Sequence, residues 1–304
     1  MRSRRTRHAL GVVATSLAAL LALSACGTGP TPSSGVLDVR HLADANSAAA
    51  VADGDLWPSC WSDDDELYAA FGDGNGFGVE FADVGMTRIT GTPQAGFDGE
   101  NLALGDELGQ VWSGEGFTRK PTGMACVDGD LYLAVQDLRL DFNEVPAATI
   151  ARSNDKGETW TWELRAPMFD DGVFTTIMFL DYGRDYAQAP DADVYAYGLD
   201  GNWRDSFDDS VADPQDLYLA RMPHDEIQDR TAWEFFAGSN DDGEPTWSRI
   251  IDDRVLYPGD AANAQGGAAN LTVISQGSIV YDDPLDTYLY TSWTELTFEL
   301  YYDI

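Results

Sequence analysis

Basic residues are scarce in this 304-residue chain, which has 18 Lys and Arg against 52 Asp and Glu and a formal charge of −34. A surface this acidic repels phosphate backbones and anionic lipid headgroups, so it excludes nucleic acid as a partner. Neutral sugars, cationic ligands and calcium are compatible with it. The charge bears on solubility and partners and leaves the fold open.

Histidine and cysteine are also rare, at three residues each. The sequence contains no C-x-x-C, H-E-x-x-H or G-x-S-x-G spacing and no phosphate-binding glycine loop, so zinc sites, hydrolytic triads and nucleotide sites are not expected. A sialidase is also unexpected, because it would need several arginines around the substrate carboxylate. We expect no cofactor, and calcium at an Asp-rich loop stays open because no ligand spacing identifies it.

Long apolar runs are missing after the first 25 residues. The one such run, residues 9–23, follows four arginines and leads into Leu23-Ser24-Ala25-Cys26. This pattern is typical of a bacterial lipoprotein signal, in which the cysteine receives a diacylglycerol. We therefore expect residues 1–25 to be removed and the protein to be secreted and tethered to the cell membrane by lipidated Cys26 alone. An ordinary signal peptide cut elsewhere is the alternative.

Removal of residues 1–25 leaves 14 basic residues against 52 acidic ones, a formal charge of −38. Apart from Cys26, the remaining cysteines are Cys60 and Cys126. An exported protein meets oxidising conditions, so a disulfide between these two is expected. Two buried free thiols are the alternative.

Residues 26–53 are rich in Gly, Pro, Ser and Ala and predict a flexible tether. Residues 54–304 predict one all-β domain, because short apolar runs alternate with Gly, Asp and Asn turns, and only 223–229 has a helical pattern. The expected strands include 67–71, 123–127, 131–135, 173–179, 194–197, 217–220 and 288–290.

The strands recur in units that resemble propeller blades. Each unit opens with an apolar strand, makes an acidic turn (63–65, 128–130 or 282–286) and returns through a strand containing Leu-Tyr. Residues 153–160 match the Asp-box S-x-D-x-G-x-T-W, whose Asp and Ser fold a hairpin turn. We count three complete blades and most of a fourth, so a five-bladed β-propeller would be incomplete at its C-terminal end.

Several separated motifs together resemble one family. They are Trp57 to Tyr68 with Gly72-Asp73-Gly74, Ser153 to Trp162, Tyr182 to Ala187, Leu217 to Pro223 and Trp233 to Phe236. The chain from about residue 54 onward is similar to the secreted bacterial proteins catalogued as domain of unknown function 4185. That resemblance implies a five-bladed propeller and, for some members, endo-D-arabinanase activity on the arabinan of mycobacterial-type cell walls.

Two carboxylates stand out as candidate catalysts. In a propeller blade the start of the first strand and the end of the second strand lie at the same end of the blade, its mouth. If the first hairpin turns at Asp64, Asp55 lies opposite Asp73, with Cβ atoms about 5 Å apart. Such a pair can supply the protonated acid and the ionised partner that glycoside hydrolysis needs. The alternatives are a solvated strand end for Asp55 and a simple Gly/Asp loop for Asp73.

The same geometry nominates further residues as substrate-binding groups. Asp137, Asp200 and Glu295 are expected at the mouths of later blades, although a turn at 128–129 would also set Asp137 opposite Lys120 as a charge partner. Trp57, Trp203 and Trp293 could stack on sugar faces, or simply pack.

The sequence thus predicts a monomeric surface lipoprotein glycoside hydrolase acting on an arabinan-like cell-wall polysaccharide. The alternative from another class is a non-catalytic propeller that binds a glycan or a protein.

Overall fold

The computed structural model of the chain describes residues 52–92, 95–203, 210–212, 214–255, 274–292 and 301–303. All of them belong to one compact unit, residues 38–304. The described part is all-β, and its helical pieces are single 3-10 turns. These are η2 Gly105–Glu107, η3 Arg184–Tyr186, η4 His224–Glu226, η5 Arg230–Ala232, η6 Ile251–Asp253 and η9 Asp283–Leu285.

The first blade is a five-stranded antiparallel sheet in which the opening strand is broken in two. Both halves pair with the same neighbour, β3, and Pro58 lies between them. Proline has no backbone N–H to give to a ladder, which explains the break. The strands are β1 Asp53–Asp55, β2 Ser59–Trp61, β3 Leu67–Gly76, β4 Ala82–Thr92 and β5 Gly96–Leu104.

The second blade is a three-stranded antiparallel sheet of β6 Phe117–Val127, β7 Asp130–Arg139 and β8 Ala148–Ser153. Its β6–β7 turn is Asp128-Gly129, both with positive φ, as a tight two-residue hairpin requires. The register shifts by one residue between Pro121 and Gly123, so β6 carries a bulge.

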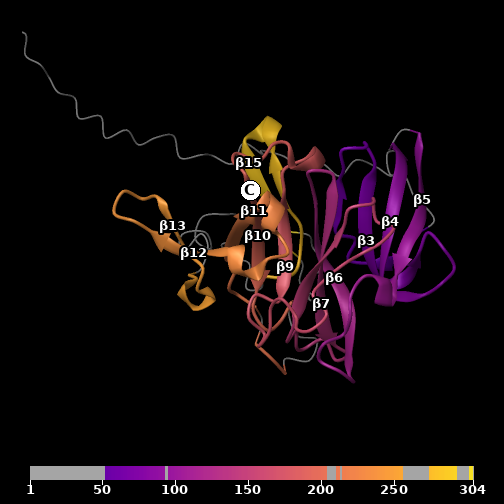
Figure 1. Cartoon of the computed structure of the whole chain (residues 1–304), viewed down its shortest axis with the longest axis horizontal. Helices are drawn as coiled ribbons and strands as arrows, with labels where there is room; N and C mark the ends of the chain where they lie inside the picture. The colour runs from indigo at the N-terminus through magenta and orange to yellow at the C-terminus, as the bar shows by residue number, and fades with distance from the viewer. Residues whose placement is uncertain are drawn as a thin grey trace, which may run out of the picture. The chain divides into compact units, whose positions relative to one another are not determined.

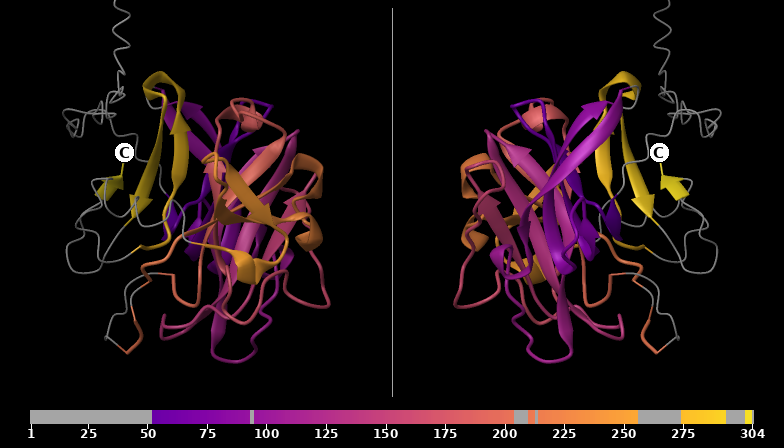
Figure 2. Two further views of the ribbon diagram at one scale, coloured as in Figure 1. Left: turned by 90° about the vertical axis from the view of Figure 1, so that its left-hand side faces the viewer. Right: turned by 90° about the vertical axis from the view of Figure 1, so that its right-hand side faces the viewer.

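The third and fourth units share one eight-stranded sheet, because β14 pairs with β9 in parallel. Figure 1 shows the successive sheets from β3 to β11, and Figure 2 shows the hairpin of β14 and β15 in yellow. The strands are β9 Thr176–Asp181, β10 Asp193–Leu199, β11 Tyr218–Pro223, β12 Glu234–Ser239, β13 Pro245–Ser248, β14 Ile279–Asp282, β15 Thr287–Ser292 and β16 Tyr301–Asp303.

This arrangement is a β-propeller fold with about four blades, and among the described residues the sheets do not close into a ring. The predicted all-β class and incomplete ring are therefore confirmed. The expected helix at 223–229 is a single 3-10 turn, η4.

Apolar side chains are buried between neighbouring blades. One cluster joins the first two blades and includes Tyr68, Met86 and Leu131, and a larger one joins the second blade to the third around Phe174 and Trp233. A blade with a neighbour on each side buries both of its faces. The successive side chains of its strands are therefore mostly apolar, instead of alternating between apolar and polar. No helix of the described part is long and apolar enough to cross a membrane.

Candidate functional site

The candidate site lies at the mouth, which we define as the end of the first blade where β1 begins and β3 ends. Asp55 comes from β1, Asp73 from β3, and Lys120 reaches them from β6 of the second blade. Strands distant in sequence thus bring three charged side chains together. We call these three residues the mouth cluster.

The mouth cluster combines two accessible carboxylates with one buried ammonium. The side chains of Asp55 and Asp73 are 56% and 42% exposed, whereas that of Lys120 is 2% exposed. The Lys120 ammonium is ion-paired with Asp73 and lies 3.9 Å from Asp55 Oδ1. A ligand in solution can therefore reach the carboxylates while the cation stays behind them.

Gly72 lets Asp55 take this position. A Cβ on Gly72 would lie 2.4 Å from Asp55 Oδ1 and 3.3 Å from Lys120 Cδ. The space beside the glycines of β3 was expected to admit a ligand, but the chain itself fills it: the carboxylate of Asp55 lies against Gly72, and the backbone of β1 against Gly74. Gly72 and Gly74 are thus needed for close strand packing.

Three residues in or next to the mouth cluster have strained backbone conformations. Leu56, Trp57 and Asp73 all have positive φ, of 69°, 42° and 39°. Such conformations are costly for residues other than glycine, and they recur at functional sites where the surrounding structure holds them. Here the strained residues lie directly beside or within the mouth cluster.

The electrostatics separate Asp55 from an ordinary surface carboxylate. Desolvation raises the pKa of Asp55; the nearby Lys120 lowers it and the negative charge of Asp73 raises it again, and the net direction is upward. Asp55 therefore holds its proton to a higher pH than a solvated aspartate. This is the property expected of a general acid in a carboxylate pair.

A pocket of about 320 Å³ is lined partly by residues that neighbour the mouth cluster in sequence, and no member of the cluster lines it. Its wall includes Leu56, which follows Asp55 in sequence, together with Thr122 of β6, Gln276 and Ser278. The volume lies at the lower end of the range typical of small-ligand sites.

The structure corrects the predicted strand registers. The β2–β3 pairing has the expected register, with Cys60 opposite Tyr68, but the break at Pro58 places Asp55 opposite Gly72 rather than Asp73. Lys120 lies opposite Gln136, and not opposite Asp137, because of the bulge after Pro121. The same bulge leaves the Lys120 side chain in contact with the first blade.

Asp137 is not available to a ligand. Its side chain is buried, and it accepts hydrogen bonds from the backbone N–H groups of Trp112 and Ser113 and from the Ser113 hydroxyl, at 2.7–2.8 Å. Burial raises the pKa of Asp137, and the Ser113 and Trp112 hydrogen bonds oppose this. Asp137 fixes the loop before β6, so its predicted role in substrate binding is corrected.

Two of the candidate tryptophans lie in the described part. Trp57 Nε1 donates to Gly54 O at 3.0 Å, and its ring packs 5.6 Å from Phe71. Trp203 is buried and packs 6.5 Å from Phe142. Both rings thus pack against aromatic neighbours, and their stacking on a sugar stays a prediction.

The last three candidate substrate-binding residues divide into two cases. Asp200 accepts a hydrogen bond from Phe174 N at 2.7 Å and is ion-paired with Arg254, so its carboxylate is engaged within the third blade. Trp293 and Glu295 lie outside the described residues, as does Cys26.

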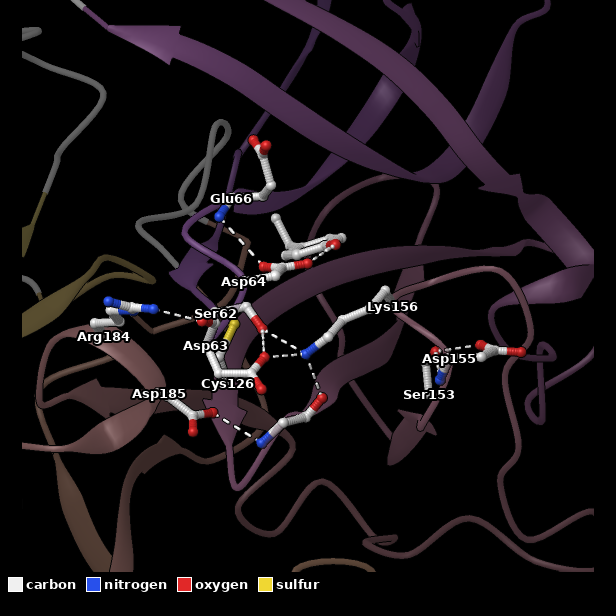
Figure 3. A network of polar contacts seen from close by, with 12 residues as sticks. Ser62, Asp63, Asp64, Glu66, Cys126, Ser153, Asp155, Lys156, Arg184 and Asp185 are labelled. Carbon is white, nitrogen blue, oxygen red and sulfur yellow. Dashed lines mark hydrogen bonds and ion pairs between the residues drawn. The ribbon is translucent and has the colours of Figure 1, made fainter.

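The acidic turn at 63–65 connects β2 to β3, at the opposite end of the first blade from the mouth. Figure 3 shows Lys156 pointing toward Ser62 and Asp63 of this turn. Lys156 donates to Ser62 Oγ at 2.9 Å and to Gly129 O at 2.6 Å, and it is ion-paired with Asp63. Asp185 accepts from Gly129 N at 2.9 Å. We call this set of contacts the turn latch, because it joins turns of the first three blades.

Cys60 of β2 and Cys126 of β6 form a disulfide, with Cα atoms 5.5 Å apart. It is a covalent link between the first two blades, which the turn latch also connects.

The segment 153–160 folds as its motif predicts. Asp155 accepts from the backbone and hydroxyl of Thr159, Ser153 Oγ accepts from Gly157 N at 2.8 Å, and the indole of buried Trp160 donates to Gly157 O at 3.0 Å. These bonds close a turn, which is a structural role. Within the described ranges, no group of three or more His, Cys, Asp or Glu could hold a metal ion.

Comparisons with known proteins identify no family. No family model and no curated protein matches the chain, so the resemblance to the domain of unknown function 4185 remains a prediction. Among solved structures, the GH43_1 enzyme from Xanthomonas citri complexed with xylotriose is 15% identical, with a TM-score of 0.48 and coverage of 84% of this chain and 71% of that one.

Two further solved structures are similar at this level. The catalytic domain of the GH62 α-L-arabinofuranosidase from Coprinopsis cinerea is 14% identical, with a TM-score of 0.34 and coverage of 85% and 92%. A Bacteroides ovatus protein assigned as a hydrolase is 10% identical, with a TM-score of 0.43, and this chain spans 64% of its length. At these TM-scores the likeness carries no argument about activity.

Proposed function

We propose that this protein is a surface-tethered glycoside hydrolase that cuts an arabinan-like cell-wall polysaccharide with Asp55 and Asp73. The observation that carries the proposal is the pair of accessible carboxylates held around one buried ammonium at the mouth. Two carboxylates in different electrostatic environments are the groups that glycosidases use.

The chemistry needs one proton donor and one ionised partner. Asp55, with its raised pKa, gives its proton to the glycosidic oxygen as the bond to the anomeric carbon breaks. Asp73 either takes a proton from the water that attacks that carbon or bonds to the carbon first and is then released by water. In both routes one water is consumed and two sugar ends are formed.

The substrate class comes from the sequence resemblance, and the physical properties of the chain are compatible with it. Arabinan is neutral, so an acidic surface does not repel it. The pocket lined by Leu56, the residue that follows Asp55, has room for a sugar unit. Attachment through lipidated Cys26, on the outer side of the cell membrane, would hold the domain close to cell-wall polysaccharide.

The test is the release of reducing ends from arabinan by the purified full chain. We expect Asp73→Asn to lower the rate about 100-fold or more, because general acid–base and nucleophilic groups contribute that much. The matched control is Asp106→Asn, whose side chain is 98% exposed and whose ion pair with Arg119 lies outside the mouth cluster.

Asp106→Asn is expected to keep the rate and the thermal transition. Asp73→Asn should unfold at a lower temperature, still in one cooperative transition, because the buried Lys120 loses its close ion-pair partner. Full activity in a folded Asp73→Asn variant would refute the assignment. Binding of arabinan by the wild type without any product would instead favour a non-catalytic glycan-binding propeller.

A further inference from the structure

Lys120 has no part in the chemistry described above, yet it is the most deeply buried member of the mouth cluster. Its side chain is 2% exposed and runs along the first blade, with Cδ 3.3 Å from the Cβ position of Gly72. Burial of a lysine is costly unless its charge is paired. Within the part of the chain that the structure describes, the charged groups within 4.0 Å of the ammonium are Asp55 and Asp73.

The contacts of Lys120 with the two carboxylates are unequal. The ammonium is in close contact with Asp73, whereas Asp55 Oδ1 is 3.9 Å away, beyond hydrogen-bonding distance. An adjacent cation favours the ionised form of the carboxylate that it touches more strongly than that of one farther away. The two carboxylates therefore lie at different distances from the one cation and in different electric fields.

We propose that Lys120 is a positioning residue that divides the roles of the pair, holding Asp73 as the carboxylate and leaving Asp55 as the carrier of the proton. The inference rests on the proposed function for its catalytic meaning. Because the ammonium is buried behind the carboxylates, Lys120 acts through them and makes no contact with substrate.

The neighbouring residue on β6 provides a matched comparison. Arg119 is also mostly buried, at 12% exposure, but its guanidinium pairs with Asp83 and Asp106 instead of the mouth cluster. Both cations come from β6, and removing either one breaks its ion pairs with acidic residues outside that strand. Of these two cations, Lys120 is the one that lowers the pKa of Asp55.

The first measurement is an NMR titration of the aspartate carboxyl carbons in the full chain, with Asp55 assigned from its Asn variant. In Lys120→Met we expect the pKa of Asp55 to rise above its wild-type value, because the cation that lowers it is gone. Arg119→Met should leave the titration of Asp55 unchanged. An unchanged Asp55 titration in Lys120→Met would overturn the inference, whether or not the protein cleaves arabinan.

The second measurement is the kinetics of arabinan cleavage. We expect Lys120→Met to lower kcat about 100-fold with KM changed less than about twofold, because misplaced catalytic groups slow the reaction while a buried side chain contributes no sugar contact. A rise in KM at constant kcat would contradict a positioning role. If Lys120→Met does not fold, Lys120→Gln makes the same comparison with a side chain that still hydrogen-bonds.

The two failures can be told apart. Wild-type protein that releases no reducing ends defeats the proposed function, and the titration still decides whether Lys120 controls Asp55.

Discussion

At the scale of single residues, the mouth cluster depends on groups that are small or strained. Asp55 occupies the space that a side chain at position 72 would need, so this position requires glycine. The next residue, Asp73, has a positive φ of 39°. The sequence pointed to both aspartates through their places at the ends of paired strands. It did not point to Lys120, whose contact with them depends on a bulge in another blade.

Gly72→Ala tests this close packing. A methyl group there would lie 2.4 Å from Asp55 Oδ1, so the carboxylate must move. We expect arabinan cleavage to fall about tenfold or more. The unfolding temperature should change little, because the displaced atom ends a half-exposed side chain.

Gly109→Ala is the matched control, since its added Cβ would make an ordinary contact 3.5 Å from Val135. Equal activity in the Gly72 and Gly109 variants would show that the exact place of Asp55 does not matter.

At the scale of elements, several strands and turns were predictable from the sequence, whereas two of the predicted registers were wrong. Short apolar runs next to acidic turns predicted part of each of β3, β6 and β7, which the structure extends to longer strands. The two departures both occur at prolines, Pro58 and Pro121, which cannot donate to a ladder. A proline inside an apparent strand was therefore the signal that could have indicated each shift.

The burial of two candidate residues was not predicted either. Asp137 and Trp203 lie at blade mouths in sequence order, but loops fold over them, and periodicity says nothing about which loop covers a strand end. Only contacts between segments distant in sequence decide that. For the same reason the role of Lys156 in joining three turns could not be found from the sequence.

The turn latch gives a prediction at this scale. Lys156→Met removes hydrogen bonds to Ser62 and Gly129 and the ion pair with Asp63, so we expect the free energy of unfolding to fall by about 1–2 kcal/mol. The rate of arabinan cleavage should not change, because the latch lies at the end opposite the mouth. Chemical denaturation and the cleavage assay measure the two effects.

Arg139→Met is the comparison for the latch. Arg139 is half-exposed and pairs with Asp141 and Glu144 in its own loop, so its loss should cost less than about 1 kcal/mol. A Lys156 variant as stable as this one would show that the turns do not depend on the latch.

At the scale of the whole molecule, the acidic charge bears on the lipid attachment that we propose. A chain with 52 acidic residues is repelled by anionic headgroups, so its surface offers no electrostatic attraction to a membrane. The diacylglycerol expected on Cys26 would then be the sole cause of membrane association.

A variant in which residues 1–26 are replaced by an ordinary cleavable secretion signal should therefore move from the membrane fraction to the medium of a bacterial host, with its fold and activity retained. Fractionation followed by immunodetection measures this. Retention of the variant in the membrane fraction would point to a second attachment.

The central claim, that Asp55 and Asp73 cut a sugar chain at the mouth, is tested most directly by a crystal structure of the Asp73→Asn variant with an arabinose oligomer. We predict a sugar bound beside Leu56, with its glycosidic oxygen about 3 Å from the Asp55 carboxyl group. An oligomer bound elsewhere on the propeller, or a glycosidic oxygen out of reach of Asp55, would contradict the account.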